Sequence, residues 1–179
     1  MKDDFALPLP RNLAAALAAP AARAQDIRAL LHDDHQQLRT LSRDMAEAET
    51  AAARRALYAE LRTLLDAHAR AEETVVYEPM LRLKGSKDSR DLGNEGIVEH
   101  EVVDELLAKL ARTDLAGTDA WKAHATVLRR VLERHLGDEE GECFEALAEH
   151  FTPAQREAMG GDFTRLRALA PRIEVVVSH

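Results

Sequence analysis

The sequence has one cysteine, Cys143, in 179 residues, and aromatic residues make up only 4% of it. A single cysteine excludes an internal disulfide, and it also excludes a zinc or iron–sulfur site built from several thiolates. Glycine and proline are also scarce, at eight and six residues. These numbers are too small for a turn-rich all-β fold.

Long hydrophobic runs and an excess of positive charge are missing as well. No apolar run approaches the ~20 residues that a membrane-spanning helix needs. The first 25 residues carry two acidic residues close behind Met1 and a proline-broken apolar part, which is not the pattern of a secretory signal. With 24 Lys+Arg against 32 Asp+Glu, the net charge of −8 argues against a surface for nucleic acid. We therefore expect a cytoplasmic protein with no membrane or nucleic-acid partner.

What remains is 46% apolar and 31% charged residues, an ordinary balance for a globular chain, with apolar positions repeating at a helical period. Asp26 is a candidate N-cap for a first helix, Pro79 is expected to bend or break the second, and Thr152-Pro153 is a typical helix start. The predicted helices cover residues 26–48, 53–84, 94–112, 118–150 and 153–170, with a loop at 85–93 and a turn at Gly117.

Short connections make consecutive helices antiparallel neighbours. The sequence therefore predicts an all-α fold, an up-down-up-down four-helix bundle with a short fifth helix at its C-terminal end. We divide the chain into an Ala/Pro-rich arm (1–24), the bundle (25–170) and a β-leaning tail (171–179) for which no partner strand is evident.

Four histidines fall one on each long predicted helix: His35, His68, His100 and His135. In an antiparallel hairpin, two residues lie at the same height when the turn is midway between them. The midpoints between successive histidines fall in the 49–53 junction, at Lys84-Gly85 and at Gly117-Thr118, where other signals already place the turns. All four imidazoles should thus lie at one level of the bundle.

Two of these histidines are followed four residues later by a glutamate, in the pairs His68/Glu72 and His135/Glu139. That spacing puts both side chains on one face of a helix. The pattern of a histidine followed by His-x-x-x-Glu occurs twice, so each half of the chain supplies two histidines and one carboxylate. No Lys or Arg lies in these stripes to neutralise the glutamates, and unpartnered buried charges are costly.

Bound metal ions would satisfy all six groups together, and imidazole with carboxylate suits iron, manganese or zinc. If both glutamates bridge, each of two metals receives two histidines and two carboxylate oxygens. Two divalent cations against two carboxylates leave a positive charge that favours an oxide or hydroxide bridge, with one position on each metal open to a small ligand. A metal-free bundle with hydrogen-bonded core histidines is the alternative.

Four neighbouring residues have other expected roles. His32 lies one turn before His35 and is an alternative first ligand. Glu73 and Glu140 each follow a proposed ligand, and we expect them beside the ligands or exposed. Cys143 is expected to be a small core residue.

The motifs His35, HARAE (68–72), EHEVVDEL (99–106) and HLGDEE (135–140) resemble those of the hemerythrin-like HHE cation-binding family, over about residues 26–170. The resemblance implies a non-haem di-iron centre in a four-helix bundle, with His35, His68, His100 and His135 as terminal iron ligands and Glu72 and Glu139 as bridges. Zinc or manganese is the less favoured loading. Members of the family bind or sense oxygen, respond to peroxide or nitric oxide, or help to repair iron centres.

The sequence departs from the invertebrate oxygen carriers of that family in two places. The carriers have a second histidine one turn after the ligand of the third helix, where this chain has Asp104. They also place the carboxylate of the fourth helix five residues after its histidine, where this chain has Glu140. The chain thus resembles the bacterial branch, which includes the repair proteins. Those proteins often carry an N-terminal module that contains cysteine, and this sequence has no cysteine before Cys143. Asp104 is a candidate additional ligand or a partner of His100.

We expect a protein that binds or responds to dioxygen, peroxide or nitric oxide, more a binding protein than a turnover enzyme. The alternatives are an iron donor or iron-centre repair protein, and a peroxide-consuming di-iron enzyme. The sequence gives no prediction of the oligomeric state.

Overall fold

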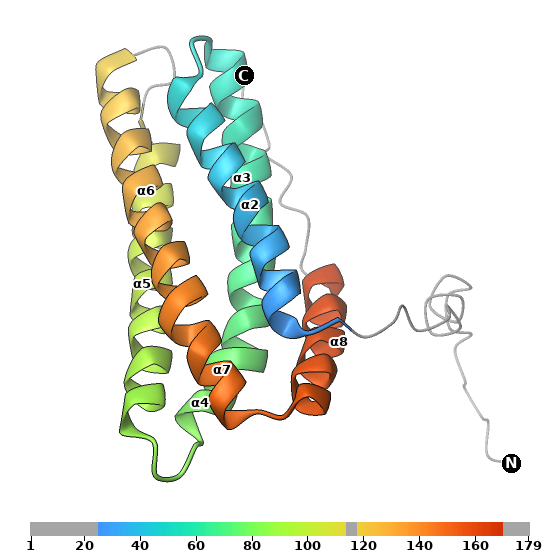
Figure 1. Ribbon diagram of the computed structural model, residues 1–179. Coiled ribbons are helices and arrows are strands. Elements are labelled where there is room, and N and C mark those ends of the chain that lie inside the picture. Colours follow the sequence, from blue (N-terminus) through green and yellow to red (C-terminus); the bar gives the residue numbers. More distant parts are fainter. Residues whose placement is uncertain (1–24, 114–117, 170–179) are drawn as a thin grey trace, which may run out of the picture.

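The computed structural model describes residues 25–113 and 118–169, and every regular element in these ranges is a helix. Four rods form an antiparallel bundle, and a fifth helix lies against one end of it (Figure 1). The rods are α2 (Ile27–Glu47); α3 (Ala51–Glu72) with η1 (Glu73–Tyr77) and α4 (Glu78–Leu81); α5 (Lys87–Ala111); and α6 (Thr118–Asp138) with η2 (Glu139–Cys143) and α7 (Phe144–His150). The fifth helix is α8 (Pro153–Leu169).

This architecture confirms the predicted all-α bundle with a C-terminal fifth helix. The predicted arm, the predicted tail and the turn at Gly117 lie outside the described residues. Within the described part of the chain, no helix has the length and apolarity needed to cross a membrane.

Side-chain caps begin most of these helices. Asp26 accepts from the backbone N–H of Arg28 at the start of α2, and Thr50 accepts from Ala53 at the start of α3. At α8, Thr152 and Gln155 form a reciprocal pair in which each side chain accepts from the other residue's backbone N–H. Such caps satisfy N–H groups that have no partner within the helix.

The predicted loop over 85–93 is wrong, because α5 already begins at Lys87. Gly85 makes the turn at φ +89°, and Ser86 caps the helix by accepting from the backbone N–H of Ser89. Gly, Ser and Asp are typical of loops, but they are equally typical of a helix start. Composition alone therefore placed the boundary seven residues too late.

Pro79 does not break the second rod, which continues through it to Leu81. The departure from α-geometry lies just before it, in the π-helix η1, where the N–H of Glu78 donates to the carbonyl of Glu73, five residues back. A wider turn there relieves the clash that a proline ring makes with the carbonyl four residues earlier. The fourth rod contains a second π-helix, η2, which begins at Glu139, one helical turn after His135.

The core consists of two apolar clusters that lie at different levels of the bundle. One includes Leu38, Leu61, Leu107 and Trp121, and the other includes Leu31, Tyr77, Met80 and Phe163. His35 stands between Leu31 and Leu38 on α2, so the predicted histidine level falls between the two clusters. Side chains at this level have little contact with water.

The fifth helix is fastened to the beginning of the first rod. Arg156 of α8 is 8% exposed, and its Nε lies 2.8 Å from Oδ2 of Asp26. Asp26 also pairs with Arg28 at 2.9 Å. Burial by itself would raise the pKa of Asp26, but hydrogen bonds from Arg28 and Arg156 outweigh it and hold that pKa well below its usual range.

We predict that Asp26→Asn destabilises the protein by about 1 kcal/mol at pH 7, because asparagine keeps the cap but loses both ion pairs. A lowered pKa in the folded state means that the carboxylate stabilises above its unfolded pKa of about 3.9 and loses this effect as the pH falls. The difference between variant and wild type, measured by urea unfolding, should therefore shrink below about pH 4. An equal difference at pH 7 and in acid would contradict this role.

Candidate metal centre

The structure brings together all six residues of the repeated His and His-x-x-x-Glu pattern, and we call these six residues the cluster. Two groups of four side chains each offer ligand atoms within 4.8 Å of one another. The first is His35, His68, Glu72 and Glu139, and the second is Glu72, His100, His135 and Glu139. Both glutamates belong to both groups, while each group has its own pair of histidines.

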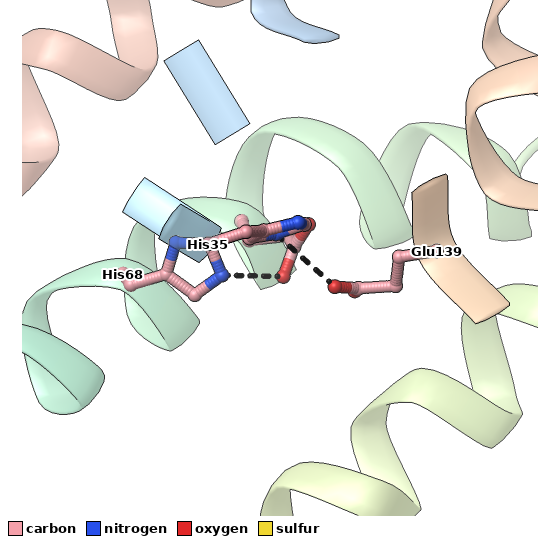
Figure 2. Close-up of side chains that lie close together, drawn as sticks. His35, His68 and Glu139 are labelled. Atoms are coloured by element: carbon pink, nitrogen blue, oxygen red, sulfur yellow. Dashed lines mark ion pairs between the residues drawn. The ribbon is translucent and has the colours of Figure 1, made fainter. Parts of the chain in front are cut away.

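Each glutamate places one oxygen between two imidazoles. Oε2 of Glu72 lies 3.4 Å from Nε2 of His68 and 3.6 Å from Nε2 of His100. Oε2 of Glu139 lies 3.4 Å from Nε2 of His35 and 3.6 Å from Nε2 of His135. Figure 2 shows His35, His68 and Glu139, from three different rods, directed at one common space.

The atoms facing this space are buried and have no hydrogen-bond partner among the described residues. They are Nε2 of His35, His68 and His100, both carboxylate oxygens of Glu72, and Oε2 of Glu139. His35 and Glu72 are 0% exposed, and Glu139 is 5% exposed. Leaving a buried polar atom without a partner costs about 1–3 kcal/mol, and more for a charged group. A cation at the common space would satisfy all of these atoms at once.

On the side away from this space, each imidazole is held by a carboxylate from another rod. The Nδ1 atoms lie 3.0 Å from Glu140 for His35, 3.4 Å from Asp34 for His68, 2.8 Å from Glu73 for His100 and 2.8 Å from Glu99 for His135. An Nδ1–H that donates to a carboxylate leaves the lone pair of Nε2 facing inward, which is the usual arrangement of metal-binding histidines.

These four contacts form a closed ring around the bundle. Each carboxylate is the immediate neighbour in sequence of a residue of the cluster, and it reaches the histidine of the next rod; the fourth rod reaches back to the first. Three of the carboxylates also pair with an arginine: Glu140 with Arg39 at 2.7 Å, Asp34 with Arg167 at 2.9 Å and Glu99 with Arg134 at 2.5 Å.

The model of the hemerythrin HHE cation binding domain matches residues 26–147, which include all six residues of the cluster. The chain belongs to this family. Comparisons with curated proteins and with solved structures gave no match. The HHE domain is a cation-binding domain, and the two groups of ligand atoms fit that description. Helix α8 lies beyond the matched residues.

The HHE domain places two of the sequence candidates outside the cluster. The side chain of Asp104 is 62% exposed and lies 3.7 Å from Arg62, so it neither joins the ligand atoms nor orients His100, whose Nδ1 pairs with Glu73. His32 is 51% exposed, and its Nδ1 lies 3.2 Å from Glu140. Both residues are one helical turn from a histidine of the cluster, but they point toward the surface.

Glu73 and Glu140 lie beside the histidines, as the sequence predicted, whereas Asp34, Glu99 and Tyr77 were missed. Asp34 and Glu99 directly precede His35 and His100, and this repeated acid–histidine pair is a signal that could have indicated them. Tyr77 donates from its hydroxyl to Oε1 of Glu139. No spacing rule connects a tyrosine of the second rod to a glutamate of the fourth.

Charge within the cluster favours a cation. Burial, together with the nearby carboxylate of Glu72, raises the pKa of Glu139 to about 7. Burial alone would lower the pKa of His68, but Glu72 and Asp34 outweigh it and raise that pKa to about 10. Burial and the neighbouring His68 instead lower the pKa of His35 to about 4. Two carboxylates in one buried space repel each other and stabilise positive charge between them.

Two pockets flank α5 and reach residues of the cluster. One, of about 330 Å³, is lined by His100 and Glu73 together with residues of α3 and α5. The other, of about 160 Å³, is lined by Tyr77, Glu139 and Glu99 among others. At 9% exposed, His100 is the most accessible of the four histidines.

We predict that Glu99→Ala weakens metal binding about 10- to 100-fold, because His135 loses the carboxylate that orients its ring. Competition between the protein and a colorimetric chelator for Fe²⁺ measures this affinity. Glu105→Ala is the matched control, since Glu105 is an exposed glutamate of the same helix. Equal affinities in the two variants would show that Glu99 does not act on the centre.

Proposed function

We propose that this HHE domain holds two iron ions, one between His35 and His68 and the other between His100 and His135, with Glu72 and Glu139 shared by both. The observation that carries this proposal is that both glutamates belong to both groups of ligand atoms. Two cations that share two carboxylates need fewer buried charges than two separate sites would.

The donor set supports iron over a softer metal. It contains only imidazole nitrogen and carboxylate oxygen, and Cys143, the one thiol, instead has its Sγ 3.9 Å from Sδ of Met80. Imidazole and carboxylate suit iron, manganese and zinc, and the likeness to di-iron members of the family favours iron.

We further propose that the domain binds or responds to dioxygen, peroxide or nitric oxide. Two irons held by these residues would supply redox chemistry toward such a small ligand. The chain's own residues provide the surroundings: the two apolar clusters exclude water, and the pocket that borders His100 is the proposed entry for a diatomic molecule or peroxide. A cytoplasmic location remains a prediction.

Two other roles would use the same centre, and they differ in whether the protein gives up its iron or consumes peroxide. An iron donor would transfer its iron to a metal-free acceptor protein, whereas a peroxide-consuming enzyme would turn over peroxide many times per centre. A binding protein takes up its ligand once per centre and keeps its iron. The pocket of about 330 Å³ that borders His100 favours binding of a small ligand.

Metal analysis of aerobically purified protein should give about two irons per chain, with the near-ultraviolet absorption of a bridged ferric pair. Glu72→Gln should lower the iron content to half or less, because the amide lacks the charge that both cations share. Glu78→Gln, at an exposed glutamate paired with Arg82, is the control and should keep two irons. Full iron content in Glu72→Gln would refute the shared-carboxylate arrangement.

A further inference from the structure

The two glutamates of the cluster are not equivalent. Both carboxylate oxygens of Glu72 lack a hydrogen-bond donor among the described residues. In Glu139 only Oε2 lacks a donor, because Oε1 accepts a hydrogen bond from the hydroxyl of Tyr77. Each half of the chain thus supplies three ligand residues, but a phenol contacts only one of the two carboxylates.

The π-helix η1 delivers this phenol. Tyr77 is its last residue, is 1% exposed, and has its ring centroid 5.5 Å from that of His100. The last residue of the corresponding π-helix η2 is Cys143, which contacts Met80. Among the described residues, only the first half of the repeat therefore provides a hydroxyl that donates to a carboxylate of the cluster.

A glycine on the facing helix makes room for the ring. A Cβ on Gly96 of α5 would lie 2.7 Å from Cε2 of Tyr77, and closer still to Cζ and to the hydroxyl oxygen. Real Cβ atoms do not approach other atoms this closely, so alanine at this position would push the phenol away from Glu139. The backbone of α5 and the side chain of Tyr77 thus fit together at the point where the hydroxyl meets the carboxylate.

We propose that Tyr77 is a positioning residue of the metal centre: its hydroxyl holds Oε1 of Glu139, so that Glu139 presents Oε2 to the space between His35 and His135. This inference rests on the proposed function, since it assigns a role toward the bound ions. It makes the two carboxylates different ligands, with Glu72 free to use both oxygens and Glu139 restrained to one.

Restraint of a ligating carboxylate is expected to slow metal loss. A carboxylate that is fixed by a hydrogen bond does not rotate away from a cation, and loss of such a partner typically weakens metal binding about 10- to 100-fold. Tyr77 is 1% exposed, so its hydroxyl meets Glu139 away from bulk solvent. Removing only the hydroxyl should therefore weaken metal binding while the packing of the ring remains.

The test compares Tyr77→Phe with Tyr58→Phe. Tyr58 is the other tyrosine of the chain, and its hydroxyl donates to the backbone carbonyl of Leu107 at 3.2 Å. Each variant is loaded with iron, and the rate of iron release to a chelator is measured together with the absorption spectrum. We expect Tyr77→Phe to release iron at least about 10-fold faster and to shift the spectrum, with Tyr58→Phe close to wild type.

Gly96→Ala provides a second route to the same displacement, with Gly161→Ala as control. A Cβ on Gly161 meets no atom within 4 Å. Circular dichroism of both metal-free variants reports whether the helices form. Gly96→Ala should release iron faster than wild type, and Gly161→Ala should not; if Gly96→Ala fails to fold, Tyr77→Phe decides the question alone.

The outcomes separate this inference from the proposed function. A wild-type protein that binds no metal overturns both. Wild-type protein with two irons, and Tyr77→Phe with unchanged release and spectrum, overturns the role of Tyr77 and leaves the iron centre standing. A visible charge-transfer band from phenolate to ferric iron that disappears in Tyr77→Phe would make Tyr77 a ligand, and would overturn its role as a positioning residue.

Discussion

Burial of two carboxylates at the same level of a helical bundle is the constraint on which the rest of this structure depends. Glu72 and Glu139 are almost entirely enclosed and share one space with four imidazoles. Such a space is stable only when positive charge occupies it and when every imidazole is turned the right way. The ring of outer carboxylates meets the second requirement, since each one fixes the histidine of the next rod and ties two rods together.

This ring also explains the positions of the arginines and of the fifth helix. Arg167 of α8 pairs with Asp34, which accepts from His68. Phe163 of α8 packs edge-on against the same imidazole, with 5.9 Å between the ring centroids. Helix α8 lies beyond the residues that the family model matches, yet it supports a histidine of the cluster. Among the described residues Glu73 forms an ion pair with His100 but with no arginine, and it lines the pocket that borders His100. Helix α8 thus supports His68, whereas His100 is the most accessible of the four histidines.

The two halves of the chain resemble each other in sequence more than in local structure. In each half a π-helix begins at the glutamate of the His-x-x-x-Glu pair or at the residue after it, and such wide turns are frequent at functional sites. The first ends in Tyr77, which bonds to the carboxylate of the opposite half, and the second ends in Cys143, which packs against Met80. The two groups of ligand atoms therefore have different surroundings.

Helix type, helix order and the common level of the four histidines were predictable from the sequence, because an antiparallel hairpin aligns residues at equal distance from its turn. The start of α5 at Lys87 was not, since the same residue types begin helices and form loops. The shift of the second rod into a π-helix before Pro79 was not predictable either, because a proline indicates a departure from α-geometry but not whether the helix breaks, bends or widens.

By itself, the sequence determined the six residues that meet, because their spacing along regular helices fixes both face and height. Only the tertiary structure decided what surrounds them: that Asp34 serves His68 and not its neighbour His35, that Asp104 turns to Arg62, and that Tyr77 reaches Glu139. These contacts join different rods, and they depend on the rotation of each rod about its axis and on rotamers. Both are set by packing across the bundle, which no period within one helix encodes.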